Sequence, residues 1–366
     1  MKYWAVLGRQ PKISLAELES LFAEVRLIAP NLAEFQVDAK PELKRLGGSI
    51  KLAEPITGPV LDYLLESLPK DHKITLGVSD FSKNATAPRA QHEALRLKCT
   101  LRKSGYSVRV VPNKTALISS AASYHNRLGE DDWRVELLRH GKAYARVIAV
   151  QDIEAYVERD QARPARDARV GMLPPKLAQI LINLCGPLPA KTILLDPFCG
   201  SGVVLQEASL MGYTPYGTDL SDRMVEYTER NLKWLGEKNA TVEQGDATNH
   251  QWNQPIGAVA CETYLGPPMS AVPIEVKLKE AKQECGGIIL GFLKNLATQI
   301  EPETPVVIAV PAWLRTNGEY QRLNILDEIQ NLGYNVKSFR NLGPDDLLYH
   351  RDQQIVAREI IVLRKK

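Results

Sequence analysis

The spacing of hydrophobic and polar positions divides the 366-residue chain into three stretches. In the first stretch, short alternating runs predict strands and a 3.6-residue period predicts helices. The expected elements, in chain order, are a strand at 2–7, a helix at 14–22, strands at 25–28 and 34–37, a short helix from Pro41 and a strand at 50–52. Ser14 is predicted as the helix N-cap, with Glu17 completing a capping box. This β-α-β-β-α-β order is the split βαβ pattern.

The second stretch runs from about residue 61 to 150 and mixes strands with one long basic helix. Its expected elements are a strand at 74–78, an amphipathic helix at 88–103, a strand at 107–111, a helix at 121–128 and a hairpin of strands 133–138 and 143–149. Residues 159–169 are rich in Arg, Asp and Pro and show no apolar period, which predicts a linker.

In the third stretch, strands alternate with helices. We expect strands at 192–195, 214–218, 241–244, 258–261 and 306–310, helices at 203–211 and 223–235, and closing strands at 336–340 and 356–363. Such alternation predicts a doubly wound, mostly parallel sheet whose ligand lies at the carboxyl ends of its strands.

Composition fits a globular protein of two or three domains, with 44% hydrophobic and 24% charged residues. The apolar runs are shorter than a membrane helix requires, and the first residues lack the features of a signal peptide, so we expect a cytoplasmic protein without membrane contact. The five cysteines form no CxxC pair, which argues against disulfides and structural zinc. We expect most of them to be buried and no metal to be bound.

Positive charge is concentrated between Lys83 and Lys114, where eight Lys and Arg residues face a single acid, Glu93. A local excess of this kind suits a phosphate-rich partner. A solvated helix face remains an alternative interpretation.

The turn from Asp196 to Gly202 (Asp-Pro-Phe-Cys-Gly-Ser-Gly) follows an apolar strand and leads into a predicted helix. Glycines allow left-handed backbone and close approach of a ligand, and a helix N-terminus favours an anionic group. Two further acids, Asp219 and Asp246, end the next two strands, where they could contact the ribose and the adenine of a nucleoside. Any single Asp could instead be an N-cap, but three strand-end acids together favour a nucleoside site.

This turn resembles motif I of class I methyltransferases, especially those that methylate guanine N2 in RNA or amino groups in DNA. The segment from Arg163 to Gln179 resembles the one that precedes motif I in THUMP-containing tRNA guanine-N2-methyltransferases, where it packs over the methionine end of S-adenosylmethionine. The resemblance is strong over 163–264 and only topological before residue 106. It implies S-adenosylmethionine as cofactor, with these binding residues: Pro174, Asp196, Pro197, Phe198, Cys199, Gly200, Gly202, Asp219, Leu220, Asp246, Ala247 and Glu262.

The acceptor motif departs from the family pattern. Amino-group methyltransferases carry [D/N]-P-P-[Y/F] after the fourth strand, where two oxygens hold the amino group and an aromatic ring stacks on the flipped base. This chain has Glu-Thr-Tyr-Leu-Gly-Pro-Pro from Glu262. We predict catalytic roles for the Glu262 carboxylate, the Thr263 carbonyl and the Tyr264 ring. The alternatives are a lost activity, with Glu262 as a strand-end cap and Tyr264 as a packing residue. Trp313 could line the same pocket or lie in the core.

The resemblance also implies an RNA-binding role for the basic segment, because THUMP modules bind the acceptor end of tRNA in the families that carry them. The predicted phosphate contacts are Arg89, Lys98, Arg102, Lys103 and Lys114. The linker arginines Arg159, Arg163, Arg166 and Arg169 could extend this footprint.

These observations together predict three domains: a ferredoxin-like domain at 1–58, a THUMP-like RNA-binding domain at 59–158 and a class I methyltransferase domain at 159–366. The predicted activity is methyl transfer to N2 of a tRNA guanosine, guanosine 10 by resemblance, in a protein that we expect to be monomeric. The alternatives are an rRNA guanine or DNA amino-group methyltransferase and a catalytically silent tRNA-binding protein.

Overall fold

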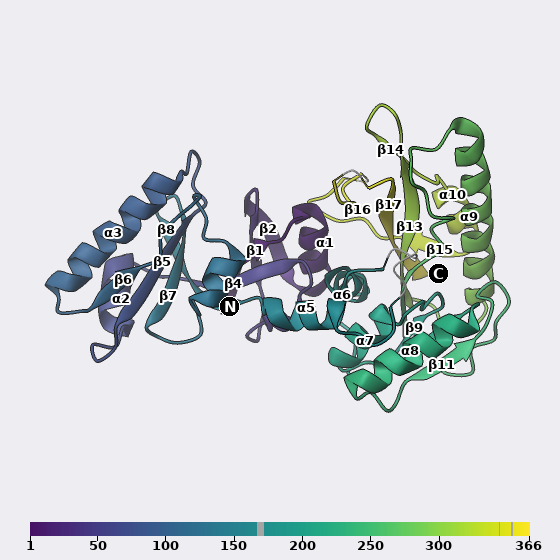
Figure 1. The fold of residues 1–366 in the computed structure, drawn as a ribbon, viewed down its shortest axis with the longest axis horizontal. Coiled ribbons are helices and arrows are strands. Elements are labelled where there is room, and N and C mark those ends of the chain that lie inside the picture. Colours follow the sequence, from purple (N-terminus) through teal and green to yellow (C-terminus); the bar gives the residue numbers. More distant parts are fainter. Residues whose placement is uncertain (167–171, 344, 353) are drawn as a thin grey trace. The chain divides into compact units, whose positions relative to one another are not determined.

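The computed structural model describes residues 1–166, 172–343, 345–352 and 354–366. The chain divides into two compact units, Met1–Ala155 and Tyr156–Lys366. Each unit has its own sheet (Figure 1). No helix in the described ranges is both long and apolar enough to cross a membrane.

The first unit contains eight strands. Its elements are β1 (Lys2–Leu7), α1 (Pro11–Leu21), β2 (Ala23–Ala29), β3 (Leu32–Gln36), the 3₁₀ turn η1 (Leu43–Arg45), β4 (Ser49–Pro55), α2 (Val60–Ser67), β5 (Ile74–Asp80), α3 (Ala87–Lys103), β6 (Val108–Val110), α4 (Ser120–His125), β7 (Arg134–His140) and β8 (Ala143–Val150). They form one sheet in the order β2-β3-β1-β4-β8-β7-β5-β6, because β4 pairs with β8. The predicted split βαβ order is present in β1 to β4, and the predicted hairpin is β7–β8.

The predicted capping box is wrong. Helix α1 begins at Pro11, so Ser14 lies inside it and its hydroxyl donates to the Gln10 carbonyl at 2.9 Å. Glu17 is buried, and its carboxylate accepts from the Gly47 and Gly48 amides at 2.8 Å each. A proline is favoured in the first helical turn, and Glu17 ties the helix to the loop before β4 rather than to its own N-terminus.

A buried ion pair holds the middle of the first sheet together. The Lys51 ammonium donates to Glu136 Oε1 at 2.6 Å and to the Ile118 carbonyl at 2.8 Å. The hydroxyls of Ser79 and Ser123 donate to the same carboxylate at 2.7 and 2.6 Å. The side chains of Lys51 and Glu136 are 2% and 0% exposed, so each charge depends on the other for its solvation.

We expect Lys51→Met to lower the free energy of unfolding by about 3 kcal/mol, because it leaves the Glu136 carboxylate buried without its cation. Lys44→Met is the matched control. Its ion pair with Glu42 is largely exposed, at 80% and 55% of the two side chains, and such pairs contribute less than about 1 kcal/mol. Urea unfolding of the whole chain measures both variants, and equal effects would contradict the assigned role of the buried pair.

The second unit begins within α5 and contains the doubly wound sheet. Its elements are α5 (Ile153–Gln161), α6 (Pro175–Leu184), β9 (Ile193–Asp196), α7 (Val203–Leu210), β10 (Thr214–Asp219), α8 (Asp222–Leu235), β11 (Thr241–Gln244), β12 (Ala258–Glu262), α9 (Glu275–Leu296), β13 (Pro305–Leu314), β14 (Tyr320–Gln321), α10 (Leu326–Asn331), β15 (Tyr334–Val336), β16 (Leu348–Tyr349) and β17 (Val356–Lys365). The strand order is β11-β10-β9-β12-β13-β17-β15, with β14 beside β13 and β16 beside β17.

The order of this sheet locates the binding region. Strands β9 to β13 are mutually parallel, and β17 runs antiparallel to β13 and β15. Strand β13 is buried along nearly its whole length, as expected for a strand covered by helices on both faces. The chain leaves β9 toward β10 on one side and later returns as β12 on the other, so the carboxyl ends of β9 and β12 flank the topological switch point.

The fold class predicted from the sequence, α/β with a doubly wound sheet after α+β units, is confirmed. Four of the five cysteines are buried, also as predicted. The three domain boundaries remain predictions; the structure shows a single sheet over both N-terminal units. The predicted linker starts too early, since α5 continues to Gln161. The 22-residue helix α9 was not predicted.

Candidate functional site

The glycine-rich turn between β9 and α7 has a backbone that requires glycine. Gly200 and Gly202 have left-handed φ angles of 53° and 81°. Gly202 is the N-cap of α7, and a Cβ there would lie 2.8 Å from Thr228 Cγ2. At Gly200 a Cβ would meet nothing closer than 3.9 Å. The second glycine therefore allows packing against α8, and the first serves the conformation of the turn.

Two neighbouring elements fix this turn. Asp219, the last residue of β10, accepts hydrogen bonds from the amides of Gly200 and Ser221, each at 2.9 Å. From α8, the Thr228 hydroxyl donates to the Gly200 carbonyl at 2.8 Å. Asp219 thus positions the turn with two acceptor sites, and a carboxylate has about four.

The carboxyl groups at the strand ends lie close enough to influence one another. Asp196 is buried, and its pKa is raised well above the ordinary value by burial and then by the charges of Asp219 and Glu262. Burial also raises the pKa of Asp219. A cluster of this kind favours a cation placed among the carboxylates, because the cation relieves their mutual repulsion.

The third predicted acid, Asp246, forms a local turn after β11. Its Oδ1 accepts from the Thr248 amide at 2.9 Å and from the Thr248 hydroxyl at 2.7 Å. Ala247 is buried, whereas Leu220, directly after Asp219, is 70% exposed. An apolar side chain so exposed at a strand end is available to pack on a flat ligand.

The remaining predicted cofactor residues surround the turn. Pro174 is the N-cap of α6, and Pro197 follows Asp196 directly. The Phe198 ring packs edge-on against Phe292 of α9, with centroids 5.2 Å apart. Burial raises the pKa of the Cys199 thiol well above its ordinary value, so Cys199 acts as a small apolar residue rather than a nucleophile.

The predicted acceptor residues follow β12. Glu262 ends this strand, and the Thr263 amide and hydroxyl both donate to the Ala309 carbonyl of β13, at 3.0 and 3.1 Å. The Tyr264 ring packs against the core, and its hydroxyl donates to Glu284 of α9 at 3.3 Å. The structure therefore places all three residues at the carboxyl end of β12, beside the glycine-rich turn.

Arg358 is a residue of this site that the sequence pattern did not indicate. It lies on β17 and is 4% exposed, and its Nε donates to Glu262 Oε1 in an ion pair. The signal in the sequence is a charged pair, Arg358-Glu359, directly before the apolar run from Ile360 to Leu363 in the same strand. A buried charge needs a partner, but only the fold identifies Glu262 as that partner. Trp313, by contrast, is fully buried in the core and does not line an open site.

The predicted RNA contacts all belong to the first unit. Arg89, Arg102, Lys103 and Lys114 are exposed and Lys98 is partly buried. The basic segment is less uniformly available than its composition indicates, because Arg96 pairs with Glu93 at 2.7 Å.

Two of the linker arginines that the structure describes, Arg159 and Arg163, are engaged in packing rather than free. Arg159 pairs with Glu207 of α7 at 2.8 Å, and Arg163 is 3% exposed. Arg166 donates to the Gln161 carbonyl at 3.0 Å, and Arg169 lies outside the described residues. Arg159 and Arg163 instead belong to the second unit's packing, as does Ala165, which exchanges two hydrogen bonds with Asn231 of α8.

Comparison with known proteins assigns a class to this region. Residues 163–270 match the family model described as RMKL-like, methyltransferase domain. These residues thus match a methyltransferase domain, and the resemblance predicted from their motifs is confirmed.

Two curated relatives match part of this chain. The chain is 38% identical over 109 residues to the tRNA (guanine(10)-N2)-dimethyltransferase of Methanothermobacter thermautotrophicus. The aligned segment covers 29% of this chain and 32% of that protein. The chain is 45% identical over 76 residues to the protein of the same name from Pyrococcus abyssi. This aligned segment covers 21% of this chain and 22% of that protein. The matched segments span about a third or less of these relatives' lengths.

A solved structure extends the likeness to the whole chain. The crystal structure of TrmN from Thermus thermophilus matches with a TM-score of 0.52 and 16% identity, covering 100% of this chain and 99% of that one. At this identity the match shows a shared fold, which includes the N-terminal unit as well as the doubly wound domain.

Proposed function

We propose that this protein is an S-adenosylmethionine-dependent RNA methyltransferase that modifies the N2 amino group of a tRNA guanosine, guanosine 10 by its likeness to the curated relatives. The observation that carries the proposal is the arrangement of Asp196, Asp219 and Glu262 around a left-handed glycine turn at the switch point. The proposed setting is cytoplasmic, with the first unit acting as a THUMP-like tRNA-binding module.

The residues present fit the cofactor. S-adenosylmethionine supplies a methyl group on a positively charged sulfonium, and the carboxyl cluster at Asp196 offers the negative charge to offset it. Asp219 uses two acceptor sites on backbone amides and retains others for ribose hydroxyls. Leu220 would pack on the adenine, with Asp246 and Ala247 at its edge.

At the acceptor side, Glu262 and Thr263 would hold the exocyclic amino group of the base. Arg358 fixes the Glu262 carboxylate by pairing with one of its oxygens, so Arg358 acts as a positioning residue. Tyr264 supplies a ring held by Glu284. Orienting the amino group is the role that these contacts support.

A labelled-methyl assay tests the proposal. With unmodified tRNA we expect N2-methylguanosine as the labelled nucleoside, and little label in duplex DNA or rRNA fragments. Preference for DNA or rRNA would change the substrate assignment. Absence of any labelled nucleoside, with cofactor binding intact, would favour a silent tRNA-binding protein, to which the altered Glu262-Thr263-Tyr264 loop gives specific support.

Cofactor affinity should rise with pH through the range in which the carboxyl groups of this cluster lose their protons. Because burial raises the pKa values of Asp196 and Asp219, these carboxyl groups keep their protons to a higher pH than ordinary aspartates, and a bound cation favours their deprotonated form. Binding therefore releases protons. Calorimetry in buffers of different ionisation enthalpy, repeated across a pH series, measures this release. The same raised pKa values make the free protein less stable as pH rises through this window.

S-adenosylhomocysteine provides the control for this pH effect, because it lacks the sulfonium charge. We expect it to release fewer protons than S-adenosylmethionine. Equal release by both compounds, or none by either, would contradict the charge-offset role of the carboxyl cluster.

RNA binding should depend on exposed cations of α3. We expect Arg102→Gln with Lys103→Gln to weaken binding of a tRNA transcript and to reduce the slope of log affinity against log salt by roughly 0.7 to 0.9 for each phosphate that is no longer neutralised. Lys40→Gln with Lys142→Gln is the charge-matched control, since both lysines are exposed on the same unit. An unchanged slope in the first variant would refute the assignment.

A further inference from the structure

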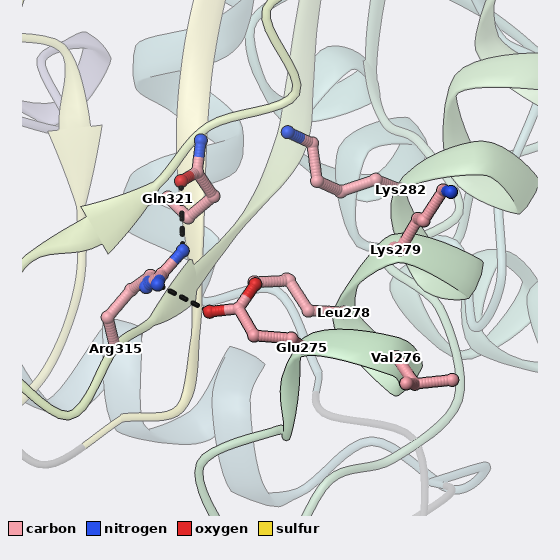
Figure 2. A pocket seen from close by; sticks show the side chains of 7 residues that line it. All are labelled: Glu275, Val276, Leu278, Lys279, Lys282, Arg315 and Gln321. Atoms are coloured by element: carbon pink, nitrogen blue, oxygen red, sulfur yellow. Dashed lines mark hydrogen bonds and ion pairs between the residues drawn. The ribbon is translucent and has the colours of Figure 1, made fainter.

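A cationic pocket lies on the second unit, between the start of α9 and the β13–β14 turn. Its volume is about 400 Å³, within the range of small ligand sites. Figure 2 shows the lining side chains: Glu275, Val276, Leu278, Lys279, Lys282, Arg315 and Gln321. None of them is among the residues assigned to the cofactor or the acceptor site.

The charges in this pocket do not balance. Glu275 forms an ion pair with Arg315, which also donates to Gln321 at 3.3 Å. Lys279 and Lys282 have no carboxylate partner among the described residues. In Figure 2, Lys282 reaches from α9 toward Gln321. The pocket therefore presents two uncompensated cations beside a neutralised pair, which suits an anion.

The walls of the pocket indicate a ligand larger than a free anion. Val276, on the rim, is 64% exposed, and the adjacent Ile274 is 65% exposed. Lys279 is exposed and Lys282 only partly buried, so the pocket opens to solvent. Apolar side chains next to cations on an open surface fit a nucleic acid strand, whose sugars and bases alternate with phosphates.

The pocket is connected to the acceptor loop through α9 and β13. The loop from Thr263 leads directly into α9, and Tyr264 is bonded to Glu284 on that helix. Thr263 pairs with Ala309 of β13, and Arg315 follows the end of the same strand. Arg315 lies six positions beyond Ala309 along this extended segment, a distance of roughly 20 Å. The distance between the acceptor loop and the pocket therefore corresponds to the length of a few nucleotides of a single strand.

We propose that this pocket binds a backbone phosphate of the RNA substrate a few nucleotides away from the methylated base, with Lys279 and Lys282 as the contacts. The inference rests on the proposed function for the identity of the nucleic acid. The contact carries no base specificity; it fixes the register of the strand over Glu262 and Tyr264. The methyltransferase domain thereby has an RNA contact in addition to the basic segment of the first unit.

The test compares Lys279→Gln with Lys282→Gln against the control Lys233→Gln with Lys294→Gln, which removes two exposed lysines from α8 and α9 outside the pocket. Binding of an unmodified tRNA transcript is measured across a salt series, together with S-adenosylmethionine affinity. In the pocket variant we expect about ten-fold weaker tRNA binding near 0.1 M salt and a slope of log affinity against log salt reduced by roughly 0.7 to 0.9, the value for one phosphate. Cofactor affinity should stay unchanged, and the control should match the wild type.

The outcomes separate this inference from the proposed function. An unchanged salt slope in the pocket variant overturns the inference even if the wild type methylates tRNA. A reduced slope supports it even if the wild type transfers no methyl group, a result that would instead refute the proposed activity. Equal weakening of tRNA binding in the control variant would also overturn the inference, because the loss of affinity would then follow from the change in net charge alone.

Discussion

Replacing Glu262 with alanine should reduce methyl transfer about 100-fold or more, a larger loss than any accompanying loss of S-adenosylmethionine affinity. The carboxylate is predicted to hold the acceptor amino group, and loss of that alignment is costly even when both reactants remain bound. Single-turnover transfer to a tRNA transcript measures the first quantity and equilibrium calorimetry the second. Retained transfer in the variant would show that Glu262 is only a strand-end residue paired with Arg358.

This experiment needs a control for the loss of stability that results when Arg358 loses its partner Glu262. Glu262→Ala leaves the Arg358 guanidinium buried without its carboxylate, which should cost about 3 kcal/mol of stability. Adding Arg358→Met removes both charges and should recover much of that stability without recovering transfer. If the double variant regained activity together with stability, the loss would be one of folding rather than of catalysis.

Asp219→Ala should weaken S-adenosylmethionine binding at least about 100-fold. The carboxylate fixes the turn through the Gly200 and Ser221 amides and is predicted to bind the ribose. Hydrogen bonds to a charged group are worth about 1.5 to 3 kcal/mol each, and removing two such bonds to the ribose would account for this change. Transfer should fall with cofactor binding, while tRNA affinity stays unchanged.

Asp222→Ala is the matched control, because Asp222 is an exposed acid three residues away in the first turn of α8. Its loss removes only a favourable interaction with the helix dipole, worth less than about 1 kcal/mol. Equal weakening of cofactor binding in both variants, or none in Asp219→Ala, would contradict the cofactor assignment.

Much of the fold could be predicted from the sequence because the local signals agree with the tertiary structure. Apolar strands such as β9 and β12 and the glycine turn after Asp196 are defined by neighbouring residues. The location of Asp196, Asp219 and Glu262 at one edge of the sheet could be predicted from the sequence, because the carboxyl ends of parallel strands share that edge.

The features that could not be predicted depend on interactions between distant residues. Helix α9 contains Gly286, Gly287 and Gly291, which weaken its helical propensity; the packing of Ile289 and Phe292 against the sheet stabilises it. Arg358 meets Glu262 across 96 positions of sequence. The role of Glu17 in holding the Gly47–Gly48 loop is likewise a tertiary interaction that a local capping rule cannot predict.

The most direct test of the proposed activity uses two tRNA transcripts that differ only at position 10, with guanosine in one and inosine in the other. Inosine lacks the N2 amino group and keeps the rest of the base. After incubation with the protein and S-adenosylmethionine, mass spectrometry of the nucleosides should detect N2-methylated guanosine in the guanosine transcript and no added methyl in the inosine transcript. Equal methylation of both transcripts, or methylation of neither while cofactor and tRNA bind, would contradict it.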